Sequence, residues 1–168
     1  IYDKISSDAI DIDFSYGKID NVEFLNIKND ALDFSGSEVK VNNATFENVN
    51  DKIISAGEDS KIYINEIIGK NSYAGIVSKD GSTVYSSDIN FDGVKIPFAV
   101  YQKKNEYDYP MLNTKNYIIK NFIVKSIKDP TSNLNIKDDI LVVNSDKILP
   151  IMYEKKIFLI KRVNSIIA

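Results

Sequence analysis

Three acidic residues near the amino terminus have the types and spacing of a carboxylate site. Asp11 and Asp13 are separated by one isoleucine, and Asp33 stands in a second copy of the same motif. Strand residues two apart point to the same side, so we expect these three carboxylates on one outward face, with Asp33 next to Asp11. Paired carboxylates can hydrolyse glycosides, and oxygen ligands bind Ca²⁺. Asp11, Asp13 and Asp33 are therefore candidate catalytic residues, and Asp11 and Asp33 form a candidate Ca²⁺ site.

Basic and polar residues in later copies of the motif are candidate partners for these acids. Lys79 and Lys103 are candidate lysine bases beside the carboxylates. We expect further ligand-binding residues along the same edge, where a sugar chain can lie and tyrosine rings can stack on it: Glu58, Asp80, Tyr101, Gln102, Lys104 and Tyr107. A structural ladder of opposite charges, or a solvated acidic edge, would explain the same residues without a ligand. Both alternatives stay open.

The composition excludes several classes of function. The chain has 168 residues, a formal net charge of −3 and lysines interspersed with aspartates, whereas general nucleic-acid binders carry a basic stripe. The absence of histidine removes Ser-His catalysis and histidine-ligated zinc, and the absence of cysteine removes disulfides and thiolate metal sites. No run approaches the roughly 18 apolar residues of a membrane-spanning helix. The chain begins at Ile1, so we expect a processed protein or a fragment of a longer one.

A repeat indicates which elements position these residues. The motif at residues 8–15 returns at 30–37 and, more weakly, at 51–58, 74–80 and 97–103. Its central apolar residues lie 22, 21, 23 and 23 residues apart: Ile10, Leu32, Ile53, Ile76 and Ala99. A nearly constant period of this length indicates stacked supersecondary units. We expect this column to fill the interior together with a second one, formed by Ile12, Phe34, Ser55, Ser78 and Tyr101.

Each repeat contains a second apolar segment, spaced by three, two and three residues. In the first repeat it consists of Ile19, Val22, Phe24 and Ile27. A step of two fits a strand and a step of three inserts a corner, so we expect about three short strands per repeat. Asparagine and glycine reach left-handed conformations cheaply and favour corners. Two corner columns are predicted: Asn21, Asn43, Glu66, Asp88 and Asn121, and Asn26, Asn48, Asn71, Gly93 and Ser126. The fifth repeat is expected to place its second segment at 119–127, after an insertion at 104–116.

Parallel stacking of such repeats predicts an all-β fold, a right-handed parallel β-helix (solenoid) of about five coils. The pattern resembles the pectate-lyase-like superfold. The strings DALDFSGS, ISAGE, IVSKD and VYQKK resemble those of a family of bacterial parallel β-helix repeat proteins, over about residues 8–127. The resemblance implies a part of a larger envelope or secreted protein, mostly without assigned activity. Lyases of this superfold generally use a basic residue, often arginine, and the only arginine here is the distant Arg162.

The C-terminal part departs from the repeat. Residues 128–133 form a turn-rich break, and strand-like runs follow at 140–143 and 157–163, with Pro150 between them. We expect residues 1–129 to form the coils and residues 130–168 a last partial coil and a C-terminal cap of extra strands. The charged residues expected to guard the edge of this cap are Lys155, Lys156, Lys161 and Arg162.

These features favour a non-catalytic structural or glycan-contacting module of a larger secreted or surface-exposed bacterial protein, located outside the cell or at its surface. The expected partner is a polysaccharide, without nucleic acid or a membrane span, and the only cofactor considered is Ca²⁺. Two alternatives stay open. One is a polysaccharide lyase or glycoside hydrolase acting on an acidic polysaccharide, and the other is a phage tail-fibre or adhesin segment.

Overall fold

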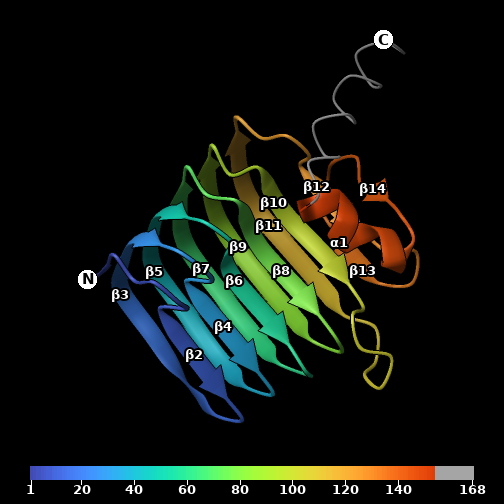
Figure 1. Ribbon diagram of the computed structural model, residues 1–168, viewed down its shortest axis with the longest axis horizontal. Helices are drawn as coiled ribbons and strands as arrows, with labels where there is room; N and C mark the ends of the chain where they lie inside the picture. Colours follow the sequence, from blue (N-terminus) through green and yellow to red (C-terminus); the bar gives the residue numbers. More distant parts are fainter. Residues whose placement is uncertain (154–168) are drawn as a thin grey trace.

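The structure, a computed structural model, describes residues 1–153, which form a parallel β-helix of about six turns. Figure 1 shows two layers of strands stacked along the axis, with helix α1 at the end of the stack that is last in the sequence. The predicted all-β parallel β-helix is confirmed, with about six turns rather than five.

Two seven-stranded sheets, called sheet A and sheet B, make up the two layers. Sheet A contains β1 (Tyr2–Asp3), β3 (Tyr16–Ile27), β5 (Glu38–Val49), β7 (Lys61–Lys70), β9 (Thr83–Asp92), β11 (Met111–Lys120) and β13 (Asn133–Asn135). Sheet B contains β2 (Ile10–Asp13), β4 (Leu32–Ser35), β6 (Lys52–Gly57), β8 (Ala74–Lys79), β10 (Ile96–Tyr101), β12 (Ser126–Lys128) and β14 (Leu141–Val142). Helix α1 spans Ser145–Tyr153.

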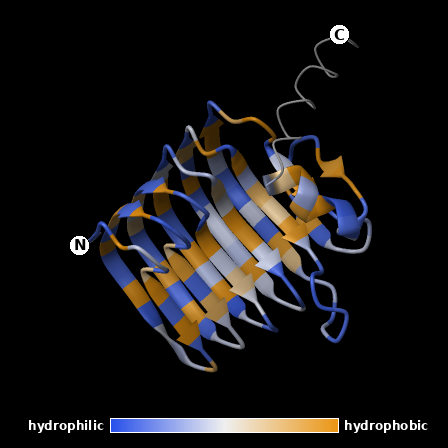
Figure 2. Cartoon of the chain, viewed as in Figure 1, coloured by the Kyte–Doolittle hydropathy of each residue, from blue (hydrophilic) through white to orange (hydrophobic). Residues whose placement is uncertain are grey.

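Columns of mainly apolar side chains, one residue from each turn, fill the interior between the sheets. One column of sheet B is Ile10, Leu32, Ile54, Ile76 and Phe98, and the next is Ile12, Phe34, Ala56, Ser78 and Val100. In Figure 2 hydrophobic and hydrophilic residues alternate along many of these strands, as expected where one face is buried.

The predicted columns were out of phase by one residue at the third and fifth turns. Ile54 and Phe98 occupy the places assigned to Ile53 and Ala99, while Ser55 and Tyr101, predicted to face inward, point outward. All residues of β6 and β10 are buried, so these strands face packed surfaces on both sides. Without alternation between buried and exposed positions, the sequence does not mark the phase of such a strand.

Left-handed residues form corners within the long strands of sheet A and at their ends. One corner column is Asn21, Asn43, Glu66, Asp88 and Asn116, and the other is Asn26, Asn48, Asn71, Gly93 and Asn121, all with φ between 47° and 75°. Four members of each predicted column are confirmed. The fifth member was wrong in both columns because the insertion ends earlier than expected. Since β11 spans Met111–Lys120, the second segment of this turn begins before the predicted range 119–127.

Helix α1 packs on the outer face of sheet B. Its buried residues Ile148 and Met152 belong to a cluster that includes Val77, Ala99 and Ile127. The strand predicted at 140–143 is present as β14, and α1 follows it where no helix was predicted. The four-residue spacing of Ile148 and Met152 places both apolar side chains on one face of this helix. The predicted strand at 157–163 and the charged guards expected beside it lie outside the described residues.

Among residues 1–153, no helix is both long enough and apolar enough to cross a membrane.

Replacing Gly75 with a larger residue tests how tightly neighbouring turns pack. A Cβ at this position would lie 2.3 Å from the Pro97 carbonyl oxygen and 2.4 Å from Cε2 of Phe91. We expect Gly75→Ala to lower the free energy of unfolding by about 1–3 kcal/mol, since the backbone of the next turn must shift. Urea unfolding measures this. Gly17→Ala is the matched control, because its Cβ meets nothing within 4 Å; equal stability of the two variants would contradict the packing described.

Candidate functional site

The outer face of sheet B changes from acidic to apolar along the axis. Three outward columns cross its strands: Asp8, Asp30, Lys52, Ala74 and Ile96; Asp11, Asp33, Ser55, Val77 and Ala99; and Asp13, Ser35, Gly57, Lys79 and Tyr101. The first two turns present acids, and the fourth and fifth present mainly apolar residues of the cluster around α1. Lysines lie at the border between these parts.

Asp11 and Asp33 are neighbours in register, as predicted. Burial and the charges of Asp13, Asp33 and Asp8 raise the pKa of Asp11. Residues 1–153 contain no group of three or more acidic side chains arranged to hold a metal ion, and Ca²⁺ takes about six to eight oxygen ligands. The structure therefore shows an acidic pair and gives no support to the calcium site.

A buried ion-pair cluster, which was not predicted, lies at the border. Asp30 and Lys52 are only 4% and 8% exposed. The Lys52 ammonium lies 3.2 Å from Asp30 Oδ1 and 2.7 Å from Asp51 Oδ2. The hydroxyl of Tyr153, on α1, donates to Asp51 Oδ1 at 2.6 Å. The cluster therefore joins sheet B to the helix.

Burial and charge oppose each other in this cluster. Burial disfavours the carboxylate of Asp30 more than the charge of Lys52 favours it, and raises its pKa to about 6. Burial also disfavours the ammonium of Lys52, but Asp30 and Asp51 more than offset this effect and raise the pKa of Lys52 above its usual range. Lys52 therefore keeps its charge at neutral pH, whereas Asp30 takes up a proton on mild acidification.

Lys79 and Tyr101 are neighbours in the third outward column, where Tyr101 is buried and Lys79 is partly buried. Burial raises the pKa of Tyr101, which is 2% exposed. Burial lowers the pKa of Lys79, and the charge of Asp33 opposes that shift. Sheet B thus brings the predicted residues Asp33, Lys79 and Tyr101 onto one face, but the covered Tyr101 ring is not available to stack on a sugar.

Asp80 holds the connection between β10 and β11. Its side chain is 2% exposed, and its Oδ1 accepts the backbone N–H groups of Lys103 and Lys104 at 2.6 and 2.7 Å. These bonds give Asp80 a structural role and fix the start of the loop, while the side chain of Lys103 remains exposed.

The other predicted edge residues bind one another across this loop. Gln102 Nε2 donates to the carbonyl oxygen of Tyr107 at 2.6 Å. The Lys104 ammonium forms an ion pair with Glu58 and lies 5.9 Å from the centre of the Tyr107 ring. The predicted acid-to-lysine edge is therefore brought together as a network of internal contacts, which favours the structural interpretation of these charges.

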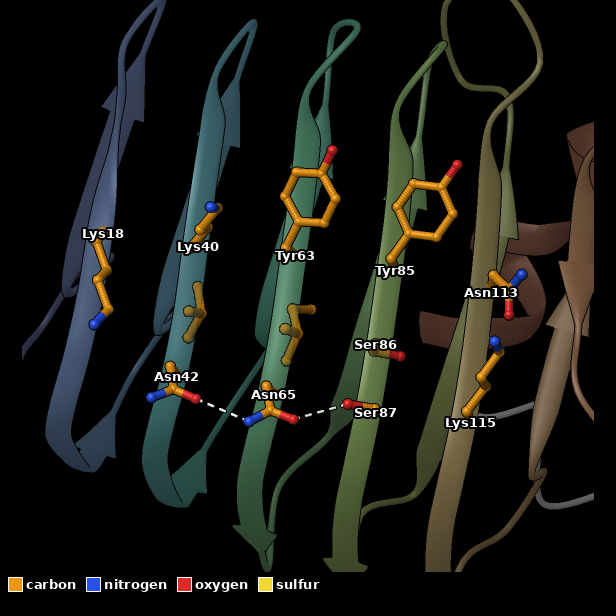
Figure 3. A pocket seen from close by; sticks show the side chains of 12 residues that line it. Lys18, Lys40, Asn42, Tyr63, Asn65, Tyr85, Ser86, Ser87, Asn113 and Lys115 are labelled. Carbon is orange, nitrogen blue, oxygen red and sulfur yellow. Dashed lines mark hydrogen bonds between the residues drawn. The ribbon is translucent and has the colours of Figure 1, made fainter.

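A shallow groove of about 530 Å³ on the outer face of sheet A was not predicted. It follows two outward columns across β3 to β11: Lys18, Lys40, Tyr63, Tyr85 and Asn113, and Asp20, Asn42, Asn65, Ser87 and Lys115. Figure 3 looks onto this face and shows these lysine, tyrosine and amide side chains arranged across successive strands. Regular strands carry every one of them, so the pairing of the strands sets their spacing along the groove.

A hydrogen-bonded ladder forms one side of the groove. Asn42 Nδ2 donates to Asp20 Oδ1 at 3.0 Å, Asn65 Nδ2 donates to Asn42 Oδ1 at 2.9 Å, and the Ser87 hydroxyl donates to Asn65 Oδ1 at 2.8 Å. Asp20 also accepts from the Lys18 ammonium at 2.6 Å. The ladder fixes the amides, yet each keeps one N–H and one lone pair for a ligand.

Two tyrosines form the centre of the groove. The rings of Tyr63 and Tyr85 have centroids 5.7 Å apart and planes inclined by only 15°. Figure 3 shows the two rings side by side on neighbouring strands. Tyr85 is 40% exposed, and the Lys61 ammonium lies 5.5 Å from the centre of the Tyr63 ring. The pair therefore offers aromatic surface at the middle of the groove.

The sequence repeat contains a pattern from which this groove could have been predicted. Lys18, Lys40, Tyr63 and Tyr85 recur at steps of 22, 23 and 22 residues, close to the period of the apolar columns. Outward positions of stacked turns meet in space just as inward ones do, so comparing outward residues at this period would have placed the lysines beside the tyrosines.

No protein-family model matches the chain, and no curated protein or solved structure matches it at a significant level. The likeness of its repeat strings to a bacterial family stays a resemblance, whereas the parallel β-helix is shown by the structure. The function is therefore inferred from the residues and geometry above.

Replacing Asp30 with asparagine is expected to remove part of the pH dependence of stability. A carboxyl with a raised pKa stabilises the folded state most below its ordinary pKa of 3.8, and this contribution is lost as the pH rises through about 6. The free energy of unfolding of the wild type should therefore fall relative to Asp30→Asn between about pH 4 and pH 7. Urea unfolding across this range checks it, with the exposed Asp139→Asn as control. Parallel curves for wild type and Asp30→Asn would contradict the expected titration.

Proposed function

We propose that the protein is a non-catalytic β-helix module that contacts a glycan through the groove on sheet A. The observation that carries the proposal is the nearly parallel pair Tyr63 and Tyr85 beside the amide ladder. Aromatic rings pack against the apolar faces of ligands, and amides and hydroxyls exchange hydrogen bonds with sugar hydroxyls. A sugar ring presents both kinds of surface.

The groove is suited to binding because little of it has to be ordered when a ligand arrives. Its side chains stand on regular strands, and the ladder bonds of Asn42 and Asn65 restrict their rotamers. Side chains held in this way lose less conformational entropy on binding than side chains on a mobile loop.

Binding is favoured over catalysis because the two columns of the groove contain a single carboxylate, Asp20, and this carboxylate is bonded to Lys18 and Asn42. Hydrolysis of a glycoside generally requires two carboxylates on either side of the scissile bond. The predicted catalytic acids Asp11, Asp13 and Asp33 lie on sheet B instead, where Lys79 is partly buried. An enzymatic site would therefore have to use the other sheet.

The wider setting belongs to the same proposal. The resemblance of the repeat strings to a bacterial family supports a module within a larger secreted or surface-exposed protein. In that setting an extended stack of turns acts as a scaffold, and the groove faces the polysaccharides outside the cell.

Removing the tyrosine rings tests the proposal. We expect Tyr63→Ala and Tyr85→Ala each to weaken glycan binding by about tenfold, because each removes aromatic surface from the centre of the groove. A glycan array with the wild type selects a ligand, and titration calorimetry with that ligand measures the affinities of the variants.

The matched control is Tyr109→Ala, which removes an exposed tyrosine from the loop between β10 and β11. Its affinity should equal that of the wild type, and its fold should be unchanged by circular dichroism. The proposal fails if the wild type binds no glycan on the array, or if the groove variants bind as tightly as the control.

A further inference from the structure

Three lysines line the groove, namely Lys18, Lys40 and Lys115, and the carboxylate of Asp20 lies beside Lys18. Lys18 is paired with Asp20 at 2.6 Å, whereas no ion pair within residues 1–153 involves Lys40 or Lys115. The chain as a whole carries a net charge of −3. The positive charge of the groove is therefore a local feature.

The lysines lie at both ends of the groove, with the tyrosines between them. Lys18 and Lys40 stand on β3 and β5, Tyr63 and Tyr85 on β7 and β9, and Lys115 on β11. Neighbouring strands are about 4.8 Å apart, so four steps from β3 to β11 span about 19 Å. A small anion cannot reach both ends, whereas an extended chain with several anionic groups can.

The ladder repeats along the same axis. Asn42, Asn65 and Ser87 stand on successive strands of sheet A and present a polar group at each step. A ligand made of repeating units meets a similar group at every strand. The ladder therefore favours a chain that crosses the strands over one that runs parallel to them.

We propose, on the basis of the glycan-contacting function above, that the ligand is an acidic glycan chain laid across the strands along the β-helix axis. Its anionic groups, carboxylates or sulfates, lie at Lys40 and Lys115, and its sugar rings pack on Tyr63 and Tyr85. The lysines supply the charge selectivity, and the strand spacing sets the length of chain that is bound.

Titration of matched oligosaccharides tests charge and length separately. The probes are a uronate series, a sulfated series and a neutral series, each from the monosaccharide to the octasaccharide. We expect both acidic series, or one of them, to bind more tightly than the neutral series, which also tells a carboxylate ligand from a sulfated one. Affinity should rise with length up to about four or five units and then level off, because the groove spans about 19 Å.

Lysine variants locate the anionic groups. Lys40→Gln and Lys115→Gln should each weaken binding of the preferred acidic oligosaccharide by about threefold, and the double variant by about tenfold. The double variant should also show a smaller loss of affinity with added salt. Lys70→Gln, an exposed lysine at the end of β7 that does not line the groove, is the control and should bind like the wild type.

The outcomes separate this inference from the proposed function. Equal binding of neutral and acidic chains, or lysine variants that bind like Lys70→Gln, would overturn the acidic ligand while the tyrosine variants still report a glycan site. A monosaccharide that binds as tightly as the longer chains would overturn the extended arrangement. Failure of the wild type to bind any glycan would overturn both.

Discussion

The pairing of each turn with the next is the constraint on which the rest of the structure depends. A turn exposes backbone N–H and C=O groups along both of its edges, and only a neighbouring strand satisfies them. Parallel pairing keeps the sheet B columns at a constant step of 22 residues from β2 to β10. Side chains of one column then meet about every 4.8 Å, so like residues stack. Phe24 and Phe46 do so inside, with centroids 5.0 Å apart, and Tyr63 and Tyr85 do so outside.

Corners absorb the differences in length between turns, so the columns stay aligned. Gly36 alone takes positive φ at the β4–β5 corner, whereas Glu58 and Asp59 both do at the β6–β7 corner. The nine residues from 102 to 110 are accommodated in the same way, because Asp80 binds the backbone where the loop begins. The groove on sheet A depends on this accommodation, because Lys115 lies beside Ser87 of the fourth turn only if the longer fifth turn keeps the register of β9.

The sequence predicted the fold and most of the corner columns because inward positions and asparagine corners recur at a nearly constant period. Phase was harder to predict where α1 and its neighbours cover sheet B, since Ile53 and Ile54 are both buried and nothing in the pattern separates them. The predicted site was based on the acids and lysines of sheet B, and the structure does place Asp11 beside Asp33. The groove was missed because Lys18 or Asn65 looks like an ordinary surface residue until the stacking of turns shows which residues lie next to it.

The two faces of the β-helix differ in what remains available to a ligand. On sheet B, the outward columns become apolar by the fourth turn, and α1 covers them. The Lys52 cluster marks the point where the acidic part meets this covered part. A buried ion pair contributes little net stability compared with apolar packing, but a single unpaired charge there would be strongly unfavourable. Asp30 and Asp51 together compensate the buried charge of Lys52, and the hydrogen bond from Tyr153 to Asp51 joins α1 to this cluster. With the apolar part of sheet B covered in this way, the outward columns of sheet A and the acidic first turns of sheet B are left open among the described residues.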